Sequence, residues 1–307
     1  MPDLRAATAD RIGRLAGRAP AWSLAILAIL SVQVGSAGSI GLFATIGASG
    51  TAWLRLSAGA VLFLLLKRPR LRGRPRREIL GAVALGATTG LMTSSFLAAI
   101  QRIPMGTAVA IEFLGPLLVA VIGTRQLRRL LWPVLALGGV LILTEPWVGS
   151  VDLLGIVFAI GGGTGWAIYI VLTAVVGDRF EGLEGLSITI PVAAVVAGVV
   201  GVPQAWGHLA WGDVVYSLGL AVLLPVLPYS LELLALRRLS TSTFGTLMAL
   251  EPAMAAGIGA LMLSQVLTPL QLGGMAAVVI AGVGAVQSGT RETPHPPAAD
   301  VPIPLVE

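Results

Sequence analysis

Four ionisable side chains lie within strongly apolar stretches of the sequence: Arg55, Glu112, Glu232 and Glu251. A charge at the centre of a membrane helix costs at least about 2.5–3.5 kcal/mol, so such residues are expected to face a cavity and to have partners. Carboxylates suit an ammonium group or a proton, whereas an arginine suits a carboxylate. Glu112 and Glu251 are therefore candidates for substrate binding or coupling, with a structural ion pair or a hydrogen bond to a broken helix as the alternative. Glu232 lies about one turn from Arg237, a position that also fits the membrane interface.

Proline residues in these stretches predict helices that are interrupted inside the membrane. The prolines concerned are Pro116, Pro225, Pro228 and Pro252, the last directly after Glu251. Proline removes an internal backbone hydrogen bond, and the freed carbonyls and half-helix ends can coordinate a zwitterion. The aromatic residues that suit the walls of such a pocket are Trp166, Tyr169 and Tyr229. Tryptophan and tyrosine also favour the membrane surface, so an interfacial position is the alternative for each of them.

The composition excludes most other classes of protein. Of the 307 residues, 56% are hydrophobic and 11% are charged, with a mean hydropathy of +0.90, whereas soluble domains have about 25% charged residues. There is no cysteine and there are only two histidines, so neither a metal centre nor a resident cofactor is expected. The segments GGGTG at 161–165 and GATTG at 86–90 follow no strand, which favours close helix packing over phosphate binding. Because the sequence contains neither G-x-S-x-G nor H-E-x-x-H, an enzyme is not expected.

Hydropathy predicts an all-α membrane protein with ten transmembrane helices. The expected spans are roughly 21–43, 47–66, 79–100, 105–124, 130–147, 153–176, 186–202, 213–234, 243–263 and 268–288. All lysine and arginine residues except Arg55 and Arg102 fall on one side of these spans, which predicts that both termini are cytoplasmic. Residues 1–20 then form a cytoplasmic segment before an uncleaved first span, and the Pro-rich residues 289–307 form a disordered cytoplasmic tail. The net charge of +5 thus reflects membrane topology, and no nucleic-acid partner is expected.

An internal repeat divides the predicted membrane region into two parts. The segment GTAVAIE at 106–112 reappears as GTLMALE at 245–251, an offset of 139 residues that carries the fourth span onto the ninth. Five helices per repeat is an odd number, so the second repeat must cross the membrane in the inverted sense. The predicted repeats are 21–147 and 148–288. Inverted repeats are typical of secondary transporters that alternate between inward-open and outward-open states, although apolar segments also recur by chance.

The repeat and three further segments resemble the EamA family of the drug/metabolite transporter superfamily. The segments are WLRLSAGA at 53–60, FLAAIQRIPMGTAVAIEFLGP at 96–116 and LPYSLELLALRRLSTSTFGTLMALEPAMAA at 227–256. The similarity covers roughly residues 20–288 and is greatest to bacterial inner-membrane exporters of threonine and homoserine. One departure is Ser240, which stands where the exporter pattern has a proline. The resemblance implies ten transmembrane helices in two inverted halves and export of small metabolites.

The sequence therefore predicts a multi-pass protein of the bacterial inner membrane that exports small amino acids, with threonine or homoserine as the expected substrate. Glu112, Glu251 and Arg55 are expected to line a central cavity, with protons as the coupling ion. The partners expected are this small-molecule substrate and membrane lipid. An importer or exporter of another small polar metabolite or drug remains an alternative, and a channel or a non-transporting scaffold is a more remote one.

Overall fold

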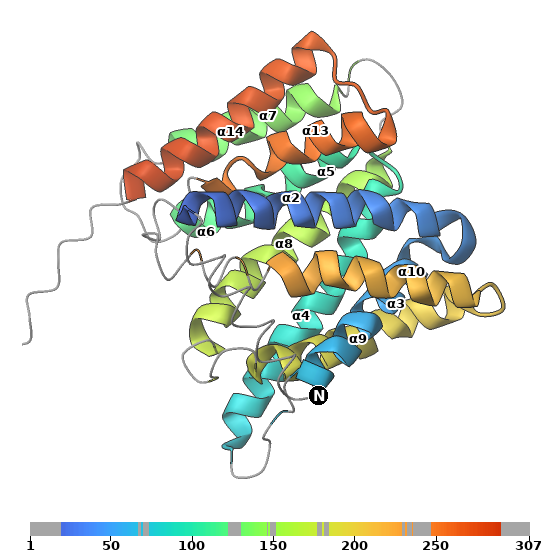
Figure 1. Cartoon of the computed structure of the whole chain (residues 1–307). Coiled ribbons are helices and arrows are strands. Elements are labelled where there is room, and N and C mark those ends of the chain that lie inside the picture. Colours follow the sequence, from blue (N-terminus) through green and yellow to red (C-terminus); the bar gives the residue numbers. More distant parts are fainter. Residues whose placement is uncertain are drawn as a thin grey trace, which may run out of the picture.

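The computed structural model describes residues 20–66, 69, 74–121, 130–145, 147, 152–176, 180, 184–228, 231, 235 and 247–289. Every regular element within these residues is a helix, as predicted (Figure 1). The helices of the first part of the chain are α2 (Ala21–Ser39), α3 (Phe43–Leu66), α4 (Arg76–Ile100), α5 (Met105–Glu112), α6 (Leu114–Val121) and α7 (Leu131–Thr144). Those of the second part are α8 (Leu153–Val176), α9 (Glu184–Ala205), α10 (Trp211–Ala221), α13 (Glu251–Leu263) and α14 (Pro269–Gly289). Short irregular helices follow α2 (η1, Ile40–Leu42) and α10 (η4, Val222–Val226).

Five of the described helical stretches are long and apolar enough to cross a membrane. They are Trp22–Leu65, Arg76–Ile100, Leu153–Thr173, Glu184–Ala205 and Pro269–Gln287. The first of them has 44 residues and contains two of the predicted spans. The shorter apolar helices Met105–Val119, Leu131–Thr144, Trp211–Val226 and Glu251–Leu263 lie in the remaining predicted ranges. Since large apolar side chains such as Leu65, Val195 and Leu261 are exposed on these helices, the outer surface suits lipid.

A bend at Gly47 separates the first two predicted spans. Gly47 has φ 70° and ψ 172°, a conformation outside the helical region that glycine adopts without a steric penalty. The amide of Gln204 fills the space that a side chain at Gly47 would need, and its Oε1 accepts a hydrogen bond from Gly50 N–H at 3.0 Å. The end of α9 therefore holds this bend in place.

In two of the predicted spans a proline lies close to a helix end or a helix break. The seventh was expected to end at 202, before Pro203, but α9 continues to Ala205 because a proline in the last turn removes only one backbone hydrogen bond. The fourth was predicted at 105–124 with a helix break at Pro116, and the structure divides it three residues earlier, at Phe113, into α5 and α6. This break shapes the candidate site described below.

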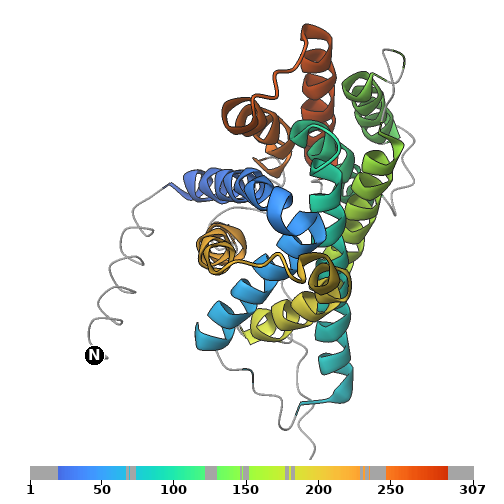
Figure 2. The ribbon, with the colours of Figure 1, turned by 90° about the vertical axis from the view of Figure 1, so that its right-hand side faces the viewer.

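The helices pack closely where glycine or alanine lies between them. The long helices α4 and α8 lie side by side in both views, and α3, α7 and α5 pack against α9, α14 and α13 respectively (Figures 1 and 2). A methyl group on Gly86 would lie 2.6 Å from the carbonyl oxygen of Thr189, and one on Gly90 would lie 2.6 Å from that of Ala193. The structure thus confirms that GATTG at 86–90 is a packing segment, here for α9.

The α7–α14 contact is reciprocal. A methyl group on Gly139 would lie 2.6 Å from the carbonyl oxygen of Gly274, and one on Gly274 would lie 2.7 Å from that of Gly139. The two backbones therefore touch, as glycine pairs in membrane helices allow. Val278 of α14 and Ile142 of α7 flank the contact on either side.

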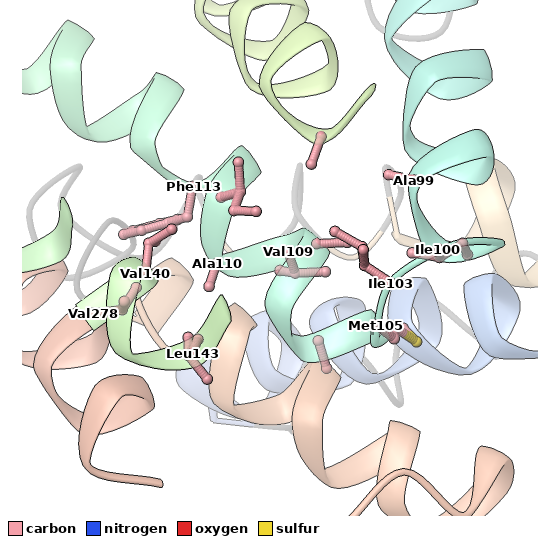
Figure 3. Close-up of a cluster of buried hydrophobic side chains, with 14 of the residues drawn as sticks. Ala99, Ile100, Ile103, Met105, Val109, Ala110, Phe113, Val140, Leu143 and Val278 are labelled. Atoms are coloured by element: carbon pink, nitrogen blue, oxygen red, sulfur yellow. The ribbon is translucent and has the colours of Figure 1, made fainter. Parts of the chain in front are cut away.

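The largest buried cluster surrounds α5. Met105, Val109 and Ala110 of α5 lie between the α4–α5 turn, with Ile100 and Ile103, and a group formed by α7 and α14 (Figure 3). All eight residues of α5 are buried, including Glu112. Since every face of this helix contacts protein, α5 is the central element of the fold.

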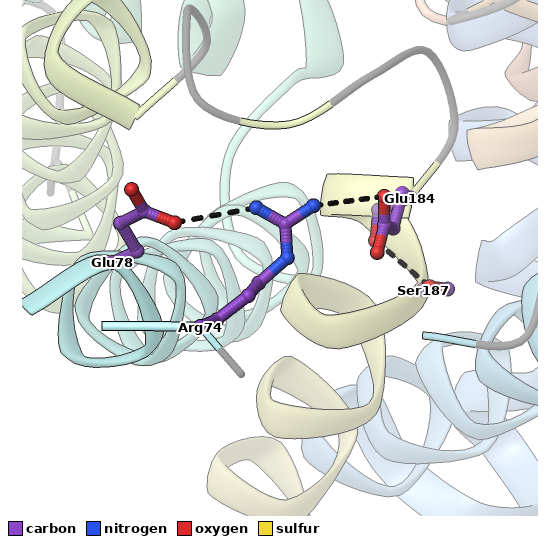
Figure 4. Close-up of polar contacts among 4 residues, drawn as sticks. All are labelled: Arg74, Glu78, Glu184 and Ser187. Carbon is purple, nitrogen blue, oxygen red and sulfur yellow. Dashed lines mark hydrogen bonds and ion pairs between the residues drawn. The ribbon is translucent and has the colours of Figure 1, made fainter. Parts of the chain in front are cut away.

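Arg74 joins the start of α4 to the start of α9. Its guanidinium lies 3.2 Å from Glu78 Oε2 and 3.0 Å from Glu184 Oε2, and 4.5 Å above the ring of Phe180 (Figure 4). Ser187 Oγ donates a hydrogen bond to the backbone carbonyl of Glu184 at 2.8 Å. The cluster links the two predicted repeats at the end that the sequence assigns to the cytoplasm.

Asp152 caps the start of α8. Its Oδ1 accepts a hydrogen bond from Gly155 N–H at 2.9 Å, and its Oδ2 accepts one from Arg102 at 3.3 Å. The Gly155 N–H and, to a smaller extent, Arg102 hold the pKa of Asp152 below its usual value. Asp152 therefore stabilises the folded state only while its carboxylate is ionised.

We expect the stability of Asp152→Asn to depend less on pH, at acidic pH, than the stability of wild type. A carboxylate with a lowered pKa contributes fully above the unfolded value of about 3.9, and its contribution is lost as the pH falls through the folded value. The measurement is thermal unfolding of the detergent-solubilised protein and of D152N from about pH 7 to about pH 3. The difference between the two midpoints should shrink toward low pH, and a constant difference would contradict this role.

Candidate functional site

The break after α5 places Glu112 at the end of a helix. Pro116 has no backbone N–H, and its ring displaces the carbonyl four residues earlier, which is that of Glu112. Helix α5 accordingly ends at Glu112, and α6 begins at Leu114. The backbone bonds of Phe113 N–H to Val109 and of Leu117 N–H to Phe113 carry the chain across the break at 2.9 and 3.2 Å.

Glu251 occupies a related position at the start of α13. It is the first residue of that helix and Pro252 is the second, a place where the missing N–H of proline costs nothing. An acidic side chain in the first turn also lies at the positive end of the helix dipole. Glu112 and Glu251 are 7% and 6% exposed, so both carboxylates are within the protein interior.

The two carboxylates are brought together by the packing of α5 against α13. A methyl group on Gly106 would lie 2.8 Å from Cβ of Ala256, so the two helices are in close contact. Glu112 and Glu251 are near enough to interact electrostatically. Oε1 of Glu112 has no hydrogen-bond partner among the described residues. The pair therefore forms an acidic centre with an available acceptor atom.

Glycine residues of α8 cover the Glu112 side of this centre. A methyl group on Gly162 would overlap Oε1 of Glu112 and would lie 2.9 Å from Cδ. One on Gly163 would lie 2.9 Å from the carbonyl oxygen of Glu112. The structure thus confirms GGGTG at 161–165 as a packing segment, and it shows that the segment packs directly against the buried carboxylate.

Trp166 contacts Phe113, the residue that follows Glu112. The two rings make an edge-to-face contact with centroids 6.5 Å apart and planes at 70°. Tyr169 packs in a separate cluster with Phe180 and Ile188. Phe113, which follows Glu112 at the break, was not among the residues singled out from the sequence.

Arg55 is buried on α3 at 2% exposure and contacts α2. Its Nη1 donates a hydrogen bond to Ser39 Oγ at 3.0 Å, and Ser39 Oγ donates to the carbonyl of Gly35 at 2.7 Å. Gln33, Ser36 and Ser39 are all buried on α2 at intervals of three residues. This polar face was not predicted, although the spacing in SVQVGSAGS was a usable signal.

A second irregular segment, η4, packs against α2. In η4, Leu224 has φ −155° and ψ 112°, so the helix is interrupted before Pro225. Ser31 Oγ donates a hydrogen bond to the freed carbonyl of Leu223 at 2.6 Å. Pro228 is buried just after this interruption.

Two predicted site residues, Tyr229 and Glu232, lie outside the described residues. Within the described ranges, no three His, Cys, Asp or Glu side chains lie close enough together to hold a metal ion.

Comparison with known proteins places these features in a family. A model described as the EamA-like transporter family matches residues 153–286. The chain is 38% identical to the threonine/homoserine exporter RhtA of Escherichia coli strain K12 over 285 residues, which cover 89% of this chain and 95% of that protein. It is 37% identical over 284 residues to the protein of the same name from Salmonella typhimurium strain LT2, with 89% and 94% covered.

The fold also has a solved counterpart at low sequence similarity. One crystal structure superposes with a TM-score of 0.57 at 13% identity and covers 87% of this chain and 96% of its own. This likeness concerns the fold alone. The relationship to the two exporters, in contrast, extends over nearly the whole of each chain at well above 30% identity. The chain is therefore a multi-pass membrane protein of the EamA family, which is a family of transporters and not of enzymes.

Proposed function

We propose that this protein is a secondary exporter of small amino acids, with threonine or homoserine as the substrate. The names of its relatives support the substrate, since both are threonine/homoserine exporters. The proposed location is the bacterial inner membrane, with ten spans and both termini in the cytoplasm. Transport proceeds by alternating access of two inverted halves, 21–147 and 148–288.

The pairing of helices supports two inverted halves. The offset of 139 residues relates the second span to the seventh, the fourth to the ninth and the fifth to the tenth. In each case the two related spans pack against each other: α3 against α9, α5 against α13, and α7 against α14. This is the arrangement expected when a pseudo-two-fold axis in the membrane plane runs between the halves.

The single observation that carries the mechanism is the buried pair of Glu112 and Glu251, because it lies where the two halves meet. A carboxylate in an apolar interior favours a bound proton or a positively charged partner, and a substrate ammonium group is such a partner. Competition between the two would exchange one for the other across the membrane. Arg55 is the proposed partner of the substrate carboxylate.

The membrane potential makes such an exchange effective. One positive charge that moves inward at 100 mV releases about 2.3 kcal/mol, which supports a substrate gradient of about fifty-fold. Proton entry therefore suffices to drive export of a small amino acid against a substantial gradient.

We expect Glu112→Gln to lose export while the protein stays in the membrane. The amide removes a charge-assisted hydrogen bond to the ammonium group, and a loss of this kind lowers transport by about tenfold or more. The measurement is efflux of radiolabelled threonine and homoserine from cells that express wild type or E112Q, with and without a collapsed proton gradient.

Three results of this experiment have different meanings. Faster efflux from wild type than from E112Q supports the carboxylate-dependent exporter, and its loss when the gradient collapses supports proton coupling. Efflux from E112Q equal to wild type, with the same response to pH, would rule out the role of Glu112. If neither amino acid leaves wild-type cells faster than control cells, the substrate assignment is wrong.

A labelling experiment distinguishes alternating access from a channel or a scaffold. The chain has no cysteine, so single cysteines introduced beside Glu112 and Glu251 are unique targets. A transporter is labelled from one side at a time, a channel from both sides, and a scaffold from neither.

A further inference from the structure

Three buried alanines bring α2, α5 and α13 into one cluster. Ala37, Ala108 and Ala255 belong to the largest buried cluster and are 2%, 0% and 0% exposed. Helix α2 packs against α13, and α13 packs against α5. One continuous buried cluster therefore joins the three helices, with α13 in contact with both of the others.

The directions of the helices are fixed by their contacts. Met105 N–H bonds to Gln265 near the end of α13, while Glu112 lies near Glu251 at its start, so α5 runs opposite to α13. Leu24 and Ala28 pack near Leu247 and Met248, whereas Ala37 clusters with Ala255, so α2 runs in the same direction as α13 (Figure 1).

One helical turn from these alanines, the three helices carry Gln33, Glu112 and Glu251. Residues four apart lie on the same face of a helix, so Gln33 lies below Ala37, Glu112 below Ala108 and Glu251 below Ala255, all in the same direction. Leu24 and Ala28 of α2 pack near Leu247 and Met248, just before Glu251. Because α2 continues from there in the same direction as α13, this register points to Gln33 near the level of the two carboxylates.

Gln33 has an acceptor atom that the fold does not use. Its side chain is 2% exposed, and Oε1 has no hydrogen-bond partner among the described residues. A buried amide oxygen without a partner destabilises the folded protein. Glu112 Oε1, one of the neighbouring acceptors, is in the same situation within the described part of the chain. Two unused acceptors at one level indicate a site for a group that donates several hydrogen bonds.

We propose that Gln33 binds the ammonium group of the substrate together with Glu112 and Glu251. A primary ammonium has three N–H donors and no acceptor, which matches one amide oxygen and two carboxylates. This inference rests on the proposed function and names a further residue of the same site. Gln33 contributes an acceptor without adding a third negative charge to the two carboxylates.

The test uses Gln33→Met in inside-out membrane vesicles, where export appears as uptake of radiolabelled threonine. Methionine has a similar length and volume but lacks the amide acceptor, so packing is kept. The half-saturation concentration for threonine is expected to rise by about tenfold or more, because a hydrogen bond to a charged group is lost. The maximal rate should stay within about twofold, since the carboxylates that exchange protons are intact.

Ser31→Ala is the matched control. Ser31 is buried on the same helix, but its hydroxyl already donates a hydrogen bond to the carbonyl of Leu223. Ser31→Ala is therefore expected to leave the half-saturation concentration unchanged. If Q33M yields too little folded protein by size-exclusion chromatography, Gln33→Asn provides the same comparison, because it keeps an amide but withdraws the oxygen by one carbon.

Each outcome decides the inference. A half-saturation concentration that rises in Q33M and not in S31A supports it. An unchanged half-saturation concentration, or a change in the maximal rate alone, overturns it while the proposed function stands. If wild-type vesicles accumulate neither threonine nor homoserine, the proposed function fails and this inference fails with it.

Discussion

A Gly162→Ala variant is expected to transport at least about tenfold more slowly than wild type while remaining folded. The added methyl group would occupy the position of Glu112 Oε1, so the carboxylate must rotate away. The side chain of Glu112 is flexible, and its displacement therefore costs little in stability. Substrate binding is weakened instead, because a carboxylate that moves by about an ångström or more no longer reaches the same hydrogen-bond donor.

The neighbouring glycine provides the control for this prediction. A methyl group on Gly161 would lie 3.5 Å from Ser95 Oγ, an ordinary van der Waals contact. Gly161→Ala should accordingly retain both the wild-type efflux rate and the wild-type melting temperature. The measurement compares threonine efflux with the amount of each variant in the membrane fraction. Equal efflux from G162A and G161A would show that the position of the Glu112 carboxylate does not control transport.

The second large effect is expected on stability, from Gly115→Ala. A methyl group at this position would overlap the carbonyl oxygen of Gly163, and backbone cannot rotate away as a side chain can. Helix α6 would have to separate from α8, with a loss of at least about 1–3 kcal/mol as in other overpacked cores. The melting temperature of the solubilised protein should fall markedly, and less protein should reach the membrane.

Gly138→Ala is the appropriate comparison, because a methyl group there would meet nothing within 4 Å. Its melting temperature is expected to match that of wild type. If G115A melted at the same temperature as G138A, the contact between α6 and α8 would be looser than the structure describes.

Hydropathy predicted the positions of the helices well where a helix is long and continuous. The sixth span was expected at 153–176, and α8 begins at Leu153 and ends at Val176. The charged residues of the candidate site were also recognisable, since a carboxylate in an apolar run is conspicuous. The roles of Glu112 and Glu251 nevertheless stay predictions until transport is measured.

Hydropathy predicts neither the residue at which the fourth span is interrupted nor the polar face of α2. A hydropathy window averages over about 20 residues, so Pro116 signalled a break in this span but nothing in the average placed it at Phe113. Gln33 shares the polar face of α2 with Ser36 and Ser39, but it has no counterpart in the second repeat to draw attention to it. Its level relative to Glu251 depends on contacts between α2 and α13, which lie more than 200 residues apart in the sequence.

The touching backbones of α7 and α14 have a mechanical consequence. Any sliding of one helix along the other would drive Ile142 or Val278 into the space that Gly139 and Gly274 leave open. The pair can therefore turn about its contact but cannot shift along it. In a molecule whose halves exchange orientation, these two helices would act as a pivot.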